Sequence, residues 1–138
     1  MLLAALSAIL PPLAEAQIVT NLHLFSGNST NGDRPNAGLI QGSDGNFYGT
    51  TQFGGSATVG TVFRISPTGE YTNLYSFGST ALFDGWQPLA ALVQGSDGYF
   101  YGTTQFGRSA TIGTVFRISP TDEYTNLYSF GNTALFNG

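Results

Sequence analysis

The chain contains no cysteine and no lysine, and these absences exclude several kinds of chemistry. Without cysteine among its 138 residues it has no disulfide, no thiolate metal ligand and no cysteine nucleophile. Charged residues make up only 9% of the sequence, the net charge is −4, and the arginines are scattered. Nucleic acid requires clusters of Lys and Arg, so no nucleic-acid partner is expected. The single histidine stands in no Ser-His-Asp arrangement that can be favoured over chance.

Long hydrophobic runs are also scarce, and only the N-terminus carries one. Residues 2–10 are predominantly apolar, two prolines follow, and residues 14–16 read Ala-Glu-Ala. This pattern is typical of a secretory signal peptide over residues 1–16, although Lys and Arg are missing from its start. The run is too short to cross a bilayer, so no membrane span is predicted. The expected location is therefore secreted or cell-surface, and a short N-terminal helix of the mature protein is the alternative.

What the chain does contain is one stretch that occurs twice. Residues 39–55 read LIQGSDGNFYGTTQFGG, and residues 92–108 read LVQGSDGYFYGTTQFGR, 53 positions later. The likeness continues to the C-terminus, because residues 39–85 and 92–138 differ at only seven of 47 aligned positions. A fixed period near fifty residues is typical of a repeat architecture.

The repeat sets the predicted organisation of the chain. A signal peptide is followed by one β-propeller-like repeat region over 17–138, made of a partial unit at 18–38, one repeat at 39–91 and another at 92–138.

Each repeat divides into short predicted strands joined by tight turns. In the first repeat the expected strands are 39–41, 46–51, 61–66 and 71–77. The Asp-Gly pairs at 44–45 and 97–98, flanked by apolar residues, are strong hairpin signals. Gly69 stands where a turn favours positive φ, and its equivalent Asp122 is a residue type that tolerates the same backbone.

Two further expectations concern the last strand of each unit. Strict alternation places Tyr71, Asn73, Tyr75 and Phe77 on one face and Leu74 on the other. Residues 18–25 resemble that last strand, TNLYSF, and predict an extra N-terminal strand.

The fold class that follows is all-β, since no helical periodicity of useful length occurs after residue 16. Both faces of each predicted sheet carry bulky residues, which suits sheets packed between neighbouring sheets. We therefore predict a partial or open β-propeller-like tandem repeat, with two complete four-stranded antiparallel blades plus one extra N-terminal strand.

Three segments carry a resemblance to a known family: LxQGSDGxFYGTTxxGG, GTVFRISPTGE, and TNLYSF followed by DGWQPLAAL. They resemble the Gloeobacter/Verrucomicrobia tandem repeat over about residues 20–138. The resemblance implies a propeller-like array on exported bacterial proteins that carry varied C-terminal anchors. It implies no enzymatic activity and transfers no catalytic residue to this chain.

The unit count departs from a closed propeller, which typically has four to eight blades. Slightly more than two units are present here. The sequence therefore favours a piece of a longer array, and assembly of several chains is the alternative, for instance three chains giving about six blades. In either case the expected partners are further repeat units or copies of the same chain.

The repeated acids are better explained by structure than by chemistry. Asp44 and Asp97 lie in the hairpin turns, where an Asp side chain accepts backbone N–H groups. A calcium loop needs several oxygen ligands at close spacing, and Ser-Asp-Gly supplies too few. No catalytic residue, cofactor or metal site is predicted.

The unrepeated residues are the candidates for a ligand or partner contact, and the two selected are Trp86 and Arg108. Trp86 lies in the loop between the units, where stacking on a sugar or partner and covering of the core are both plausible roles for so large a ring. His23 occupies the position of Tyr75 and Tyr128, so a packing role is expected for it.

Two functions from different classes remain. The first is a secreted, non-catalytic repeat module with a structural or recognition role toward a protein or glycan. The second is a fragment of a propeller enzyme that acts on extracellular polysaccharide. The near-identity of the two copies favours the first, because it leaves little room for one unit to specialise.

Overall fold

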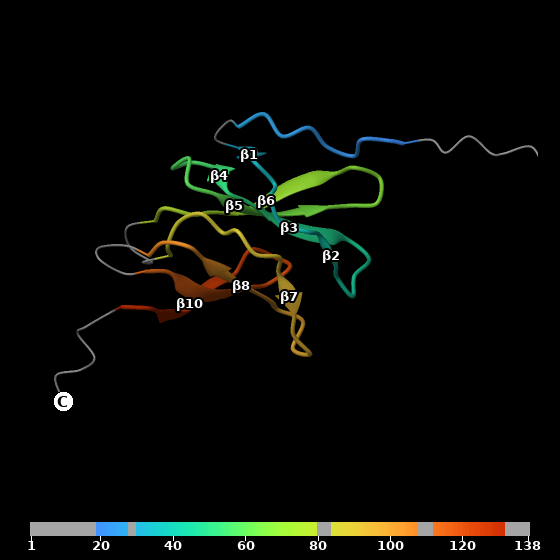
Figure 1. Cartoon of the computed structure of the whole chain (residues 1–138). Helices are drawn as coiled ribbons and strands as arrows, with labels where there is room; N and C mark the ends of the chain where they lie inside the picture. The colour runs from blue at the N-terminus through green and yellow to red at the C-terminus, as the bar shows by residue number, and fades with distance from the viewer. Residues whose placement is uncertain (1–18, 28–29, 80–83, 108–111, 132–138) are drawn as a thin grey trace, which may run out of the picture.

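The computed structural model describes residues 19–27, 30–79, 84–107 and 112–131, and these contain strands and turns without a helix. Two four-stranded antiparallel sheets dominate the structure (Figure 1). The first sheet has the order β2-β3-β5-β6, which are Ile40–Gln41, Phe47–Thr51, Thr61–Ile65 and Tyr71–Ser76. The second has the order β10-β9-β8-β7, which are Tyr124–Ser129, Thr114–Ile118, Phe100–Thr104 and Val93–Gln94. The predicted all-β fold is confirmed as an open, propeller-like pair of sheets, neither of which closes into a barrel.

The turns between the strands form as the sequence predicts. In the first hairpin the Gly45 N–H donates to the Gly42 oxygen at 2.9 Å, and Gly45 has φ +83°. This is a type I turn followed by a left-handed residue, one of the common hairpin connections. At the later turn, Gly69 has φ +94° and Asp122 has φ +74°, so both copies adopt the left-handed backbone expected there.

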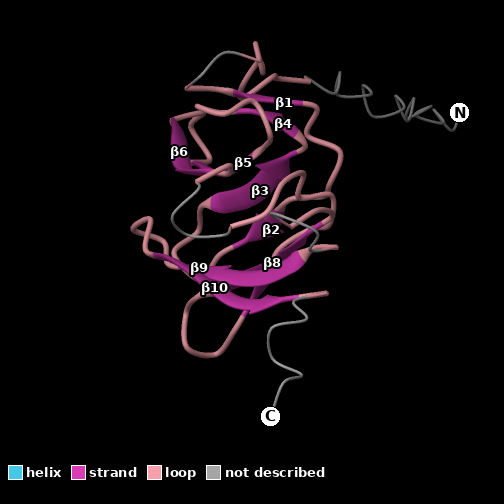
Figure 2. Ribbon diagram, turned by 90° about the vertical axis from the view of Figure 1, so that its left-hand side faces the viewer, coloured by secondary structure: helices cyan, strands magenta, loops and turns pink. Residues whose placement is uncertain are grey.

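The two sheets are stacked face to face. The first sheet lies above the second, and the N-terminal segment, which we define as residues 19–27, crosses the opposite face of the first sheet (Figures 1 and 2). The core lies between the sheets and consists of aromatic and aliphatic side chains from both. Its fully or nearly fully buried members are Tyr48, Val62, Leu74, Phe77, Leu92, Phe100, Phe116 and Ile118.

The last strand of each sheet does not alternate regularly, which corrects the predicted facing. Val62 pairs with Tyr75 and Phe63 pairs with Asn73, so Leu74 is an extra residue in a β-bulge. A bulge shifts the phase of the pleat. Leu74 and Tyr75 therefore both face the second sheet, whereas the ring of Tyr71 packs on the opposite face with His23 and Phe63. The second sheet has the same bulge, at Leu127.

The extra N-terminal strand is absent from the described residues 19–25, which join no sheet. They lie where the last strand of a preceding unit would lie, but no strand among the described residues pairs with them. A short β1 (Gly32–Asp33) follows and pairs with β4 (Phe53–Gly54). The isolated bridge between Trp86 and Phe106 is the same pairing 53 residues later. Nowhere in the described ranges is there a helix that is long and apolar enough to cross a membrane.

Candidate functional site

The candidate functional site is the junction between the two units, where side chains of both sheets meet. We call the described residues 39–79 the first unit and 92–131 the second unit. Strand pairing and ring contacts assign the two faces of each unit. The front face carries Phe63, Ile65 and Tyr71 or their equivalents, and the rear face carries Tyr48, Val62, Tyr75 and Phe77 or their equivalents. At the junction the rear face of the first unit packs against the front face of the second, and the Tyr48 ring stacks on Phe100 with centroids 3.8 Å apart.

Four further rings interlock across this junction. Tyr75 stacks on Tyr124 with a centroid distance of 4.1 Å and an interplanar angle of 7°. Phe77 meets Phe116 edge to face at 5.2 Å. Both are favoured geometries for aromatic pairs, and each adds to the free energy of burial.

The same arrangement recurs on the other side of the first unit. His23 stacks on Tyr71 at 4.0 Å with an angle of 7°, and Phe25 meets Phe63 edge to face at 5.1 Å. The N-terminal segment thus reproduces, with two rings, the contact that the first unit makes with the second. The predicted packing role of His23 is confirmed, because it occupies the place of Tyr75.

Tyr75 and His23, the equivalent rings of these two stacks, each have a polar anchor. The Tyr75 hydroxyl donates to Asp84 Oδ2 at 2.6 Å, and His23 Nε2 lies 2.9 Å from Asn31 Oδ1 at the equivalent place. Asp84 is buried and also accepts the N–H groups of Gly78 and Ser79 at 3.1 and 3.0 Å. Burial, together with the hydrogen bond to Asp84, raises the pKa of Tyr75 well above its ordinary value.

A polar contact at the hairpin turns ties the two units together at their edge. The Ser43 N–H donates to Gln94 Oε1 at 2.9 Å, and Gln94 Nε2 donates to Ser43 Oγ at 3.3 Å. The Gln94 amide is held in place by a second bond from Nε2 to the Gly98 oxygen at 3.2 Å. The contact between the two units therefore includes polar groups as well as rings.

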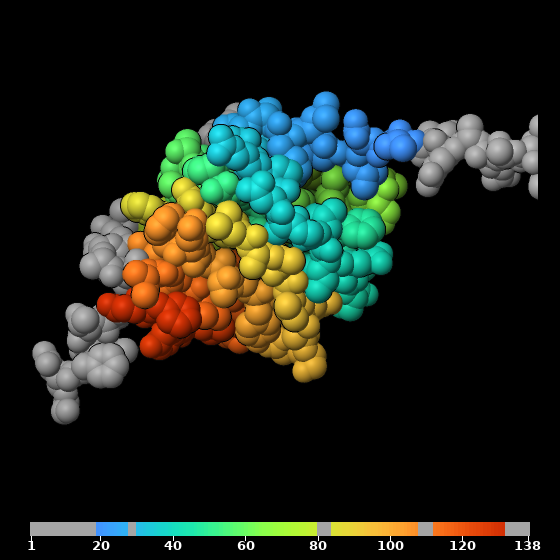
Figure 3. Space-filling model, in the orientation of Figure 1, coloured from blue at the N-terminus to red at the C-terminus, as the bar shows by residue number. Residues whose placement is uncertain are grey.

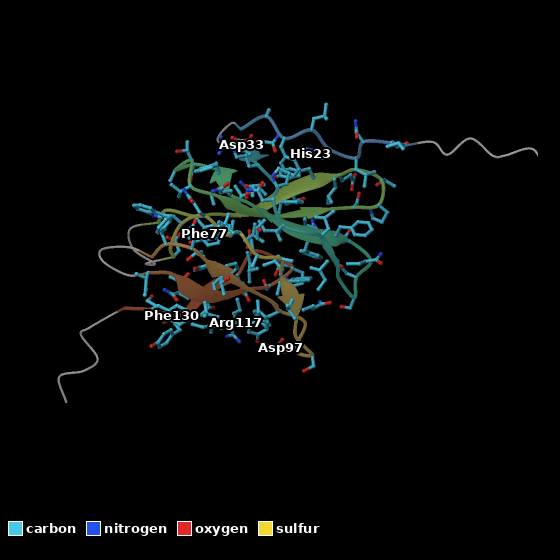
Figure 4. All side chains as sticks on the ribbon, in the orientation of Figure 1. His23, Asp33, Phe77, Asp97, Arg117 and Phe130 are labelled. Atoms are coloured by element: carbon cyan, nitrogen blue, oxygen red, sulfur yellow. The ribbon has the colours of Figure 1, made fainter. Side chains whose placement is uncertain are left out.

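The rear face of the second unit has the same ring pair but nothing described covers it. Tyr128 and Phe130, equivalent to Tyr75 and Phe77, are 53% and 44% exposed, whereas Phe77 is fully buried. Figure 4 shows His23 above the first sheet, Phe77 between the sheets and Phe130 on the outer side of the second. In the space-filling view this end of the second unit forms the lower surface of the molecule (Figure 3).

The repeated acids act in the turns, as predicted from sequence. Asp44 Oδ1 accepts the Asn46 N–H at 3.1 Å, and Asp44 Oδ2 accepts the hydroxyl of Tyr48 at 2.7 Å. Partial burial opposes ionisation of Asp44, but the hydrogen bonds from Asn46 and Tyr48 outweigh it and lower its pKa. The tyrosine partner was not anticipated from the sequence, although the Asp-x-x-x-Tyr spacing is visible in both copies.

Asp97 makes the equivalent bonds, to the Tyr99 N–H at 3.2 Å and the Tyr101 hydroxyl at 2.6 Å. The hydrogen bond from Tyr101 is the main reason that the pKa of Asp97 is lowered. Within the described residues, no group of three or more His, Asp or Glu side chains is placed to hold a metal ion.

The two selected contact residues have different outcomes. Trp86 is 43% exposed, and its backbone exchanges hydrogen bonds of 2.7 and 3.2 Å with Phe106, whose side chain is also exposed. Residues that exchange both bonds in an antiparallel pair present their side chains on one face. Trp86 and Phe106 therefore form an exposed aromatic edge. Arg108 lies outside the described residues.

The sequence comparisons agree with this repeated architecture. The family model described as the Gloeobacter/Verrucomicrobia repeat matches residues 12–138, which is nearly the whole chain. No curated protein matches the chain.

Proposed function

Because the chain belongs to the Gloeobacter/Verrucomicrobia repeat family, we propose that it is an exported, non-catalytic repeat module whose role is structural: its units stack in one direction. One observation carries the proposal. The ring pair Tyr75 and Phe77, which joins the first unit to the second, occurs two more times in the structure. Its equivalents are His23 and Phe25 in the N-terminal segment, and Tyr128 and Phe130 on the rear face of the second unit. A surface that recurs in every unit serves contact between units, because repeat modules bury their faces against neighbours.

The way the polar side chains are used supports a non-catalytic role. The buried carboxylate of Asp84 is occupied by a tyrosine hydroxyl and two backbone N–H groups. The buried hydroxyls of Thr51 and Thr61 bond to each other at 2.7 Å, and Thr104 and Thr114 repeat this at 2.8 Å. Such groups are committed to holding strands together. A propeller enzyme acting on polysaccharide is the alternative, and it needs reactive groups beyond these.

A recognition role is a second candidate, and the exposed edge of Trp86 and Phe106 favours it. One repeat earlier the equivalent positions hold Asp33 and Phe53. Two aromatic residues therefore stand together at Trp86 and Phe106 but not at the earlier position, and large aromatic rings suit binding of a glycan or a protein. Arg108, two residues after Phe106 in the sequence, is proposed as a further ligand or partner contact.

Export is proposed from the N-terminal sequence pattern, with cleavage before Gln17. It is tested by expressing the full chain in a bacterium that secretes proteins and measuring the mass of the product outside the cytoplasm. A product beginning at Gln17 is expected. A full-length product confined to the cytoplasm contradicts export.

The non-catalytic role is tested with the purified protein and a panel of extracellular polysaccharides. We measure new reducing ends and co-sedimentation with insoluble glycans, for the parent and for Trp86→Ala. We expect no new reducing ends, and any glycan binding should weaken in Trp86→Ala. Reducing ends that grow with protein concentration and vanish after heat unfolding would establish the enzyme alternative.

A further inference from the structure

We propose that the rear face of the second unit binds the front face of the first unit of another copy of this chain, head to tail, and that the N-terminal segment competes for that front face. The inference rests on the proposed function, because it names the partner that continues the stack. The internal junction is the template for this contact: the rear face of the second unit presents one of its halves, and the front face of the first unit presents the other.

The rear face of the second unit presents one half, already arranged for binding. Tyr128 and Phe130 meet edge to face with centroids 5.0 Å apart at 77°, and the buried pair Tyr75 and Phe77 has 5.2 Å and 83°. The rings therefore need little rearrangement to accept a partner. Exposed clusters of large apolar side chains mark interaction surfaces, and tyrosine-rich clusters often dominate their energetics.

Beside these rings lies a hollow of about 210 Å³ lined by Val93, Tyr101 and Val115 among others. In the first unit the equivalent place is filled, because Phe100 of the second unit stacks there on Tyr48. The repeat equivalent of Phe100 is Phe47, on the front face of the first unit. The hollow therefore fits Phe47 of a second copy.

The front face of the first unit presents the other half, and the N-terminal segment covers it incompletely. Leu39 is 53% exposed, whereas its equivalent Leu92 is 3% exposed at the internal junction. Pro35 is exposed, whereas its equivalent Pro88 is fully buried. A cavity of about 330 Å³ lies between the segment and this face, lined by Leu22, His23, Phe25, Pro35, Leu39 and Phe63 among others. The segment thus replaces one strand of a preceding unit and leaves the space of the others empty.

The polar edge contact has matching halves at the two ends as well. The Gln41 amide is fixed by a bond from Nε2 to the Gly45 oxygen at 3.1 Å, as Gln94 is fixed on Gly98. Ser96 is exposed at the turn equivalent to that of Ser43. If a second copy docks in the way that the two units of one chain pack together, Ser96 of one chain lies beside Gln41 of the other.

The segment and a second copy cannot occupy the front face together. His23 and Phe25 already lie on Tyr71 and Phe63, in the positions that Tyr128 and Phe130 of another copy would take. The apparent association constant between copies is therefore the intrinsic constant multiplied by the fraction of chains in which the segment is displaced. Because such a contact is not self-complementary, it extends to a ring or a filament.

Cross-linking tests the geometry in the full chain, which has no cysteine of its own. Gln41→Cys and Ser96→Cys are made in separate chains, mixed and treated with a short bismaleimide. The double variant Ser43→Cys/Gln94→Cys is the matched control within one chain. We expect heterodimers only when both single variants are present, together with an intrachain cross-link in the control.

Sedimentation velocity tests the competition. Phe25→Ala loosens the segment, and we expect association to strengthen at least tenfold relative to the parent. Adding Tyr128→Ala to Phe25→Ala should remove that gain, which separates specific docking from aggregation of an exposed face. Circular dichroism of each variant verifies that the sheets are intact.

Three results would overturn the inference: monomers throughout, Ser96–Ser96 cross-links in place of the mixed ones, or association of Phe25→Ala that survives Tyr128→Ala. If the intrachain control still reacts, the stacked units of the proposed function stand and only docking between copies falls. If the control also fails, unit stacking itself is wrong.

Discussion

Tyr75 and Asp84 are nine positions apart in the sequence, and a hydrogen bond of 2.6 Å joins the tyrosine hydroxyl, as donor, to Asp84 Oδ2. Their equivalents one unit earlier are His23 and Asn31, which keep the bond at 2.9 Å with different chemical groups. The chain thus preserves a stacked ring with a polar anchor while the residues change. Asp84 also binds the backbone that follows Phe77, so this pair fixes the end of the last strand.

The anchor should contribute measurably to stability. Tyr75→Phe leaves the buried Asp84 carboxylate one donor short, and we expect a loss of about 1.5–3 kcal/mol in the free energy of unfolding. Asp84→Asn should cost less than Asp84→Ala, because the amide oxygen still accepts, as Asn31 does. Urea denaturation of the three variants measures the free energy of unfolding and checks this order. Equal losses for Asn and Ala at position 84 would contradict an anchoring role.

The turn acids should respond differently from a calcium site. Asp44→Asn and Asp97→Asn should be mild, because Asn keeps an acceptor for the turn N–H. Each Ala variant should lose more stability than its Asn counterpart, and Asp44→Ala, which removes the acceptors of the Asn46 N–H and of the Tyr48 hydroxyl, should lose about 1 kcal/mol for each bond. Thermal melts of all four, with and without calcium, make the measurement. A calcium-dependent rise in Tm that is lost in both Asn variants would show the carboxylates to be ligands.

Much of the fold was predictable because local signals and the repeat agree. The hairpin at Asp44 and the left-handed backbone at Asp122 follow from turn chemistry that needs no tertiary information. The bulge at Leu74 was not predictable, because the sequence of so short a strand is compatible with regular alternation and with a bulge. The prediction of a strand over residues 18–25 was wrong for a physical reason: the sequence fits a strand, but within the described part of the chain no neighbouring strand pairs with residues 19–25.

The candidate site was only partly predictable. The packing role of His23 followed from its alignment with Tyr75, which needed only the spacing of the repeat. The contrast between the buried Phe77 and the exposed Phe130 depends on which face meets a neighbour. That is a property of stacking order, and the nearly identical sequences of the two units cannot reveal it.

Stability should fall at alkaline pH through the tyrosines of the junction. Burial, with the hydrogen bond to Asp44, raises the pKa of Tyr48 from 10.0 to about 12, and burial also raises the pKa of Tyr124. A raised pKa means that the folded state stabilises the neutral hydroxyl relative to the charged tyrosinate. The contribution is complete below pH 10 and is lost as the pH rises through about 12.

We therefore expect the free energy of unfolding to decline from about pH 10 upward, in step with tyrosinate absorbance. Tyr48→Phe, which removes one of these groups, should make the decline shallower. Complete tyrosinate formation near pH 10 with the sheets intact would show that the hydroxyls are not protected by the fold.

The most direct test of unit stacking compares two phenylalanines that are equivalent in sequence and differ in burial. Phe77 is fully buried at the junction, and Phe130 is 44% exposed. Unfolding is measured in urea at protein concentrations low enough to keep the chain monomeric, for Phe77→Ala and Phe130→Ala, with Phe77→Leu as a milder variant. We predict a loss of about 3–5 kcal/mol for Phe77→Ala, the usual cost of truncating a buried phenylalanine. Phe130→Ala should lose under about 1 kcal/mol, in keeping with a largely exposed ring. Equal losses at the two positions would contradict the stacking of the units.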